Sequence, residues 1–224
     1  MESRTTQLPK DQLPQPRKLP VQARSKALVD AIAESCLRIL DKEGEDALTV
    51  NRIAEVSGAT VGSIYQYFPN KESMIAAVYE RLLDQESVQL YQMRERLHGL
   101  PLHAVLRQIF ANMIRVELRL HGLSPGFHAR YRSALHLGLW HAPQASTQEF
   151  INTTWLPLLQ IYADEVQTDQ PELAAYLLGK GLREIIHNAV QDMPAQARSH
   201  AFLDALVTMA LSCTQTKRGP QAAL

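Results

Sequence analysis

A short stretch in the first third of the chain, SGATVGSIYQYFPNKES at residues 57–73, constrains the fold more than any other. Gly58 separates two short segments that carry apolar residues at helical spacing. A glycine adopts the positive φ that a tight turn between two helices needs. Pro69 and Asn70 then end the second segment. The stretch therefore predicts two short helices joined by a tight turn, a helix-turn-helix at about residues 48–67.

Apolar residues in the rest of the chain recur at intervals of three and four, the spacing of amphipathic helices. A first helix is predicted from about Val21 to Glu43, closed by Gly44, and a longer one begins after its cap, Asn70. No stretch shows a convincing alternation of β-branched residues, as a strand would. Further helices are predicted at about 86–97, 101–120, 125–137, 144–167, 171–191 and 196–214. We therefore expect an all-α fold.

The composition of the chain divides it into three parts. Residues 1–20 hold four prolines, several glutamines and almost no periodic apolar residues, which predicts a flexible tail. Residues 21–85 are expected to form the domain that carries the helix-turn-helix. Residues 86–224 form a second, larger helical part.

Charge and cysteine content limit the classes of protein less than the motif does. The 224 residues hold 23 Lys and Arg against 23 Asp and Glu, so bulk charge argues neither for nor against a nucleic-acid partner. A local basic face is still compatible with this total, but any such patch must arise from the placement of charges in the fold. Cys36 and Cys213 lie in apolar helical patterns and are expected to be small buried hydrophobes. Without a signal peptide or an apolar stretch of transmembrane length, we expect a cytoplasmic protein with no membrane partner.

The two predicted short helices have the mechanics of a DNA-reading pair. Ile53 and Ala54 would face the partner helix, and Val61 and Ile64 would anchor the second helix from below. Small residues at the start of the second helix would allow close approach to a DNA groove. The outer face would carry Thr60, Gly62, Ser63, Tyr65, Gln66 and Tyr67.

Lys71 stands in the first turn of the following helix. The first backbone N–H groups of a helix have no partner within it, and the helix dipole adds partial positive charge there. A lysine at this place adds a full charge to a ready anion site. We expect a DNA phosphate to occupy it.

Together these residues resemble the N-terminal signature of the TetR-type (TetR/AcrR) transcriptional regulators. The resemblance covers roughly residues 24–85, and Ala59 and Met74 are mild departures from it. The matching residues are Thr49, Ile53-Ala54, Gly58, Gly62, Ile64-Tyr65, Tyr67-Phe68 and Lys71-Glu72.

The resemblance implies an Ω-shaped homodimer in which each chain has about nine helices. Helices two and three would read DNA, and the remainder would bind a small effector and dimerise through its last two helices. It also implies that Tyr65 and Tyr67 touch the DNA backbone, that Phe68 packs into the core, and that positions 60–66 reach the major groove. The expected DNA-binding residues are Thr49, Thr60, Val61, Gly62, Ser63, Tyr65, Gln66, Tyr67 and Lys71.

The stretch GFHARYRSALHLGLWHAP at residues 126–143 combines aromatic and cationic side chains, and further rings follow on the next predicted helix. One interpretation is core aromatics with solvated cations. The other is an effector pocket with aromatic walls and a few polar anchors, suited to a lipophilic or aromatic ligand. The candidate pocket residues are Phe127, Tyr131, His136, Trp140, Trp155, Tyr162 and His187.

The last two predicted helices carry apolar residues on more than one face. A helix on the surface of a monomer needs only one such face. Two faces suit a helix packed on its own chain and on a symmetry mate, although a fully buried helix within one chain would show the same pattern. The candidate dimer-interface residues are Leu182, Ile186, Phe202, Leu206 and Met209.

We expect no catalytic residues, no metal and no cofactor. The histidines, all between His98 and His200, lie at least five residues apart, so none are spaced at i and i+4. No phosphate-loop or nucleophile-elbow pattern occurs. The hypothesis is a ligand-responsive repressor that binds a palindromic operator as a dimer and is released by a small-molecule effector. The alternatives are an activator of the same architecture and a small helical enzyme.

Overall fold

The computed structural model describes residues 14, 16–17, 22–96, 99–131 and 151–215. Every regular element in these ranges is a helix, so the predicted all-α fold class is confirmed. The chain divides into two compact units. The first unit comprises residues 1–85 and 120–136, and the second comprises residues 86–119 and 137–224.

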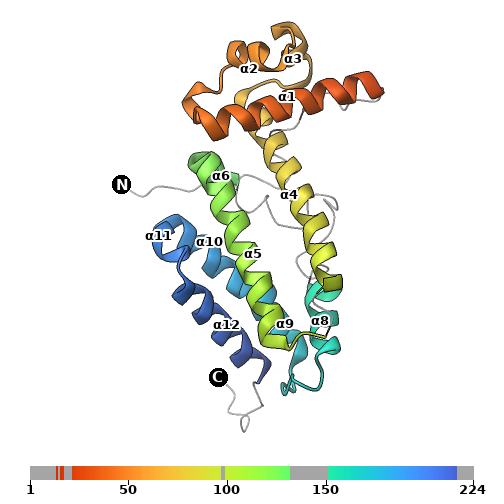
Figure 1. Ribbon diagram of the computed structural model, residues 1–224, viewed down its shortest axis with the longest axis vertical. Helices are drawn as coiled ribbons and strands as arrows, with labels where there is room; N and C mark the ends of the chain where they lie inside the picture. Colours follow the sequence, from red (N-terminus) through yellow and green to blue (C-terminus); the bar gives the residue numbers. More distant parts are fainter. Residues whose placement is uncertain (1–13, 15, 18–21, 97–98, 132–150, 216–224) are drawn as a thin grey trace, which may run out of the picture. The chain divides into compact units, whose positions relative to one another are not determined.

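Seven elements lie between residues 23 and 131, and Figure 1 shows α2 and α3 together on one side of α1. Both α4 and α5 start in one unit and end in the other. The elements are α1 (Ala23–Lys42), η2 (Glu45–Ala47), α2 (Val50–Ser57), α3 (Val61–Tyr67), α4 (Lys71–Arg96), α5 (Leu102–Leu123) and α6 (Pro125–Tyr131).

The core of the first unit collects side chains from each of its helices. Cys36 is fully buried in α1 and behaves as the small hydrophobe that the sequence predicted. Burial raises the pKa of its thiol to about 12, because the thiolate would be desolvated there. Residues fully buried beside it in this unit include Ile32, Ile39, Ile53, Ile64, Phe68, Ile75 and Val78.

Tyr79 ties α4 to the end of α5 within the first unit. Its hydroxyl donates to the carbonyl oxygen of Leu120 at 2.5 Å and lies 3.1 Å from that of Ser124. Its ring meets Phe127 edge to face, with centroids 5.0 Å apart. The Ser124 hydroxyl in turn donates to the Glu45 carboxylate at 2.6 Å. Residues 120–131 therefore pack against α4 and η2, although they are far from both in the sequence.

One predicted boundary in this region is wrong. We expected separate helices on either side of residue 85, but α4 runs unbroken from Lys71 to Arg96. The apolar periodicity lapses near Asp84, yet the segment contains neither glycine nor proline. Helix propensity therefore carries the backbone through the lapse.

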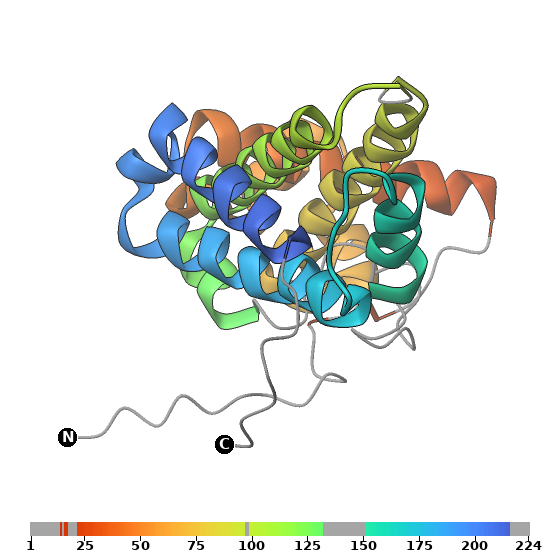
Figure 2. The same ribbon diagram turned by 90° about the horizontal axis from the view of Figure 1, so that it is seen from below.

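Apart from parts of α4 and α5, the helices of the second unit follow residue 150 along the described chain. In both views α12 lies alongside the helical segment 171–192 (Figure 1; Figure 2). The predicted last helix is interrupted at Arg198-Ser199, and the Ser199 hydroxyl caps α12 by accepting from Phe202 N–H at 3.2 Å. The elements are η3 (Ile151–Trp155), α8 (Leu156–Ile161), α9 (Pro171–Tyr176), η4 (Leu177–Gly181), α10 (Leu182–Asp192), α11 (Pro194–Ala197) and α12 (His200–Thr214).

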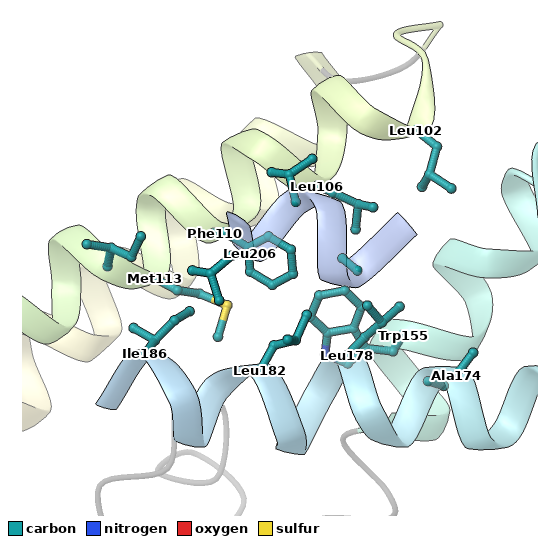
Figure 3. Close-up of a cluster of buried hydrophobic side chains, with 14 of the residues drawn as sticks. Leu102, Leu106, Phe110, Met113, Trp155, Ala174, Leu178, Leu182, Ile186 and Leu206 are labelled. Atoms are coloured by element: carbon teal, nitrogen blue, oxygen red, sulfur yellow. The ribbon is translucent and has the colours of Figure 1, made fainter. Parts of the chain in front are cut away.

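The core of the second unit is organised around Trp155 (Figure 3). Its indole stacks on the Phe110 ring with centroids 6.2 Å apart. The other edge of the indole lies against Gly179, where a Cβ would stand 2.6 Å from Trp155 Cδ1. Trp155 and Gly179 each belong to a π-helical turn, η3 and η4. Gly179 is therefore required by close packing, with an ordinary backbone conformation.

Two polar contacts fix the start of α5 in the second unit. The Leu102 N–H donates to both carboxylate oxygens of Glu165 at 3.0 Å, which satisfies an unpaired donor of the first helical turn. Arg107 forms an ion pair with Asp204 of α12.

Candidate DNA-binding site

The first helix of the pair, α2, is bounded by the residues that the sequence predicted. Thr49 caps its start, because the side-chain oxygen accepts from Arg52 N–H at 3.2 Å. Gly58 ends it in the left-handed region, with φ 71° and ψ 6°, and its N–H donates to the Ala54 carbonyl at 2.9 Å. The predicted turn glycine is confirmed.

The second helix, α3, has local signals at both ends. Thr60 caps it, since its hydroxyl oxygen accepts from Ser63 N–H at 3.1 Å. The Thr60 and Ser63 hydroxyls are also 2.8 Å apart and share a hydrogen bond. The Phe68 backbone turns extended at φ −115° and ends the helix. Both hydroxyls are thus oriented before any DNA binds.

The outer face of α3 is polar and aromatic. Tyr65 is 46% exposed and Val61 38% exposed. Thr60, Gly62 and Gln66 are also exposed, while Ser63 is half-buried. These exposed side chains are available to contact base edges in a groove of DNA.

Two expectations for α3 need correction. Val61 does not anchor the helix from below, because the anchoring face is made by Ile64 and Tyr67. Tyr67 does not lie on the outer face, since it is only 7% exposed. A short helix has one buried stripe, and Tyr67 lies three residues beyond Ile64 on that stripe. A DNA contact by Tyr67 stays a prediction, and only the small exposed part of its side chain is available for it.

Lys71 is the first residue of α4, and Asn70 caps that helix by accepting from Ser73 N–H at 2.8 Å. The Lys71 ammonium reaches back to η2 and donates to the Glu45 carbonyl at 2.5 Å. An ammonium has three N–H donors, so this bond leaves capacity for a phosphate. The contact with η2 fixes where the charge lies.

Sequence reasoning missed the ion pairs of Arg52. The guanidinium contacts Glu43, just after α1, at 2.9 Å and Glu55 within α2 at 2.7 Å. The Arg52 hydrogen bonds lower the pKa of the Glu43 carboxyl, and the two carboxylates raise the pKa of Arg52. The Glu55 spacing at i+3 was the available signal. The Glu43 pair links α2 to the end of α1, whereas the Glu55 pair lies within α2.

Sequence reasoning also assigned no contact to Arg17. Its backbone N–H donates to the carbonyl of Tyr67 at 2.7 Å, fifty residues along the chain. No signal in the sequence indicated this bond, because it is made by a backbone N–H and joins residues far apart in the chain.

The candidate pocket residues fall in different parts of the chain. Phe127 and Tyr131 lie in the first unit with ring centroids 4.5 Å apart. Trp155, Tyr162 and His187 lie in the second unit. His187 Nδ1 is hydrogen-bonded to the Glu117 carboxylate there. His136 and Trp140 lie outside the described residues.

The candidate interface residues divide by burial. Leu182, Ile186 and Leu206 are core residues of their own chain, at most 3% exposed, so they leave no surface for a partner. This corrects their assignment to the interface: the apolar stripe they form covers the Trp155 core. Phe202 is half-buried, and Met209 is 44% exposed.

A capped α2, a left-handed glycine turn and a short α3 with an exposed polar face define a helix-turn-helix protein of the DNA-binding class. The sequence profile of "Bacterial regulatory proteins, tetR family" matches residues 29–78. This match lies on the helix-turn-helix region and supports the resemblance to the TetR-type regulators that the sequence indicated.

Individual proteins are also similar to this chain. The chain is 30% identical over 70 residues to YvdT, an uncharacterised HTH-type transcriptional regulator of Bacillus subtilis (strain 168). That match covers 31% of this chain and 34% of YvdT, so it spans about a third of the relative's length. The crystal structure of a protein assigned to the TetR family from Mesorhizobium loti MAFF303099 shares the fold. Its TM-score is 0.60 at 20% identity, over 86% of this chain and 97% of that one.

None of the helices in the described part of the chain is long and apolar enough to cross a membrane.

Proposed function

We propose that the protein is a repressor that binds a palindromic DNA operator as a homodimer and leaves it when a small molecule binds. The exposed outer face of α3, held by its Thr60 cap and by buried Ile64, is the observation that carries the proposal. Such a face brings donors and acceptors to base edges in a major groove.

The proposed DNA contacts divide into two kinds. Thr60, Val61, Ser63 and Gln66 would read bases, and Gly62 would let the backbone approach closely. Thr49, Tyr65, Tyr67 and Lys71 would bind the phosphate backbone and supply most of the affinity, which would depend strongly on salt.

Exposed apolar side chains on the helices of the second unit support a homodimer. Ile185 on α10 is exposed, as are Met193, just after that helix, and Met209 on α12. These three replace the buried Leu182, Ile186 and Leu206 as the proposed interface, together with half-buried Phe202. A twofold dimer would place two reading heads on successive major grooves about 34 Å apart.

The second unit also supports a lipophilic or aromatic effector. Trp155 is buried, and its indole N–H has no hydrogen-bond partner among the described residues. A buried donor without a partner is costly, so a ligand acceptor there would gain affinity. Tyr162 and the His187–Glu117 pair would add polar anchors in the same unit. Release is then a population shift, limited by the effector's differential affinity for the DNA-bound and free states.

The test begins with the full chain, which is used to select the duplexes it binds from a library of random DNA sequences. Gel shifts then measure its affinity for a selected duplex. The double variant Tyr65→Ala, Gln66→Ala removes two exposed side chains and should keep the fold, checked by circular dichroism. We expect it to lose most of the affinity, while the control Gln191→Ala, exposed at the end of α10, keeps it. Full affinity in the folded double variant would contradict the assigned face.

The finer role is tested by transcription in vitro from a promoter that carries the selected duplex. Repression by the protein supports the proposal, whereas stimulation would indicate an activator of the same architecture. Turnover of a substrate by a wild-type chain that selects no duplex would favour an enzyme instead.

A further inference from the structure

The chain ahead of α1 docks on the end of the helix proposed to read DNA. The backbone N–H of Arg17 donates to the carbonyl oxygen of Tyr67 at 2.7 Å. Tyr67 is the last residue of α3, and Phe68 after it is extended. The last backbone carbonyls of a helix receive no hydrogen bond from within the helix, so their donors come from outside it. Arg17 therefore closes the C-terminal end of α3.

The sequence around Arg17 suits an extended docking segment. Pro14 and Pro16 each lack an N–H and fix their own φ, and a residue that precedes proline is held extended. Arg17 thus supplies the first backbone donor after Pro16. Both prolines are half-buried, whereas Arg17 is exposed.

The guanidinium of Arg17 is available to a ligand. No described residue forms a salt bridge with it, in contrast to Arg52, which is held by two carboxylates. The backbone of Arg17 is hydrogen-bonded to the end of α3. DNA in contact with the exposed face of α3 would therefore lie close to the Arg17 guanidinium. A planar guanidinium binds a phosphate with two parallel hydrogen bonds.

We propose that Arg17 binds a phosphate of the DNA backbone beside the groove that α3 reads, on an arm anchored by its own backbone N–H. The inference rests on the proposed DNA-binding function. It adds to the helix-turn-helix one phosphate contact per head from a segment outside it. The backbone bond to Tyr67 positions the arm, and the side chain makes the contact.

The test measures the affinity of the full chain for its selected duplex over a series of salt concentrations. Arg17→Ala removes the guanidinium but keeps the N–H that bonds to Tyr67, so the fold and the melting temperature should stay unchanged. We expect weaker binding to every duplex tested, and a fall of about 0.9 in the slope of log affinity against log salt for each bound head. Arg17→Lys should keep most of the slope.

Arg198→Ala is the matched control, because it removes the same charge from an exposed position in the second unit. An unchanged slope in Arg17→Ala would overturn the inference, and so would an equal fall in Arg198→Ala. A loss confined to duplexes with A·T-rich flanks would replace the phosphate contact with a minor-groove one. If the wild type selected no duplex, the proposed function would fail as well, whereas wild-type binding with an unchanged Arg17→Ala slope defeats the arm alone.

Discussion

The two units of this chain specify their helices in different ways. In the helix-turn-helix region, each helix begins or ends at a residue that acts on its immediate neighbours: Thr49, Gly58, Thr60 and Asn70. In the second unit, the segment 171–192 continues through a π-helical turn whose shape depends on Trp155, more than twenty residues away.

This difference teaches where each unit is sensitive to change. A DNA-reading surface needs two short helices with defined ends, and local caps define those ends in α2 and α3. The second unit relies on one aromatic centre and on close backbone approach. Substitutions in the first region should therefore act mainly on local geometry and DNA affinity, and those in the second on global stability.

The largest expected effect is that of Trp155→Ala. Removing the indole from between Phe110 and Gly179 should lower the unfolding free energy by about 3–5 kcal/mol, measured by urea denaturation. Trp155→Phe retains a ring against Phe110 and should cost less. If the alanine variant denatured like the wild type, the second unit would not depend on this centre and the contrast with the first would be lost.

Gly179→Ala should come next. The added Cβ would stand 2.6 Å from a rigid indole, so overpacking should cost about 1–3 kcal/mol in urea denaturation. Gly181→Ala is the matched control in the same turn, because its Cβ would meet nothing closer than 3.9 Å. It should be neutral or stabilising by up to about 1 kcal/mol. Equal losses in the two variants would point to backbone flexibility as the cause.

Gly58→Ala tests the corresponding expectation for the first unit. Its φ of 71° is strained for alanine, so we expect a loss of about 1 to 2 kcal/mol together with weaker DNA binding. Gly62 is helical, and an added Cβ would meet nothing closer than the Thr60 hydroxyl oxygen at 3.9 Å. Gly62→Ala should therefore keep or raise the melting temperature while reducing DNA affinity. A stable Gly58→Ala variant with wild-type affinity would show that the turn does not need its left-handed residue.

Glu43→Gln should have the smallest effect, and one that depends on pH. The Arg52 pair lowers the folded-state pKa of Glu43, so its stabilisation is present above the unfolded-state pKa and is lost as pH falls through the folded one. The variant should melt slightly below the wild type at pH 7, with the difference vanishing in acid. Asp30→Asn, an exposed charge on α1, controls for lost charge. A difference that grew in acid would have the wrong sign for this pair.

The predictable features of the fold are those with local causes. Thr49, Gly58 and Asn70 were predictable because a cap or a left-handed residue acts within three or four positions. The continuity of α4 was missed, since a lapse in apolar spacing resembles a break when no partner helix is visible. The inward side of α3 was also placed imperfectly, because in a seven-residue helix a single misjudged residue rotates the face.

The site was only partly predictable for the same reason. The sequence indicated the anion site at Lys71, but its bond to the Glu45 carbonyl joins residues 26 apart. No residue near Arg17 in the sequence indicated a contact with Tyr67. The buried positions of Leu182 and Leu206 depend on which of two apolar stripes meets Trp155, and periodicity alone shows both stripes equally.

The hydrogen bonds of Tyr79 bear on how this protein can be dissected in the laboratory. A gene fragment that stops at residue 85 would encode the entire helix-turn-helix, yet it would remove the Leu120 and Ser124 carbonyls that accept from the Tyr79 hydroxyl. It would also remove the Ser124 hydroxyl that donates to Glu45, the residue whose carbonyl holds Lys71. A minimal DNA-binding fragment of this chain would therefore also have to include residues 120–131, joined through a linker or added as a separate peptide.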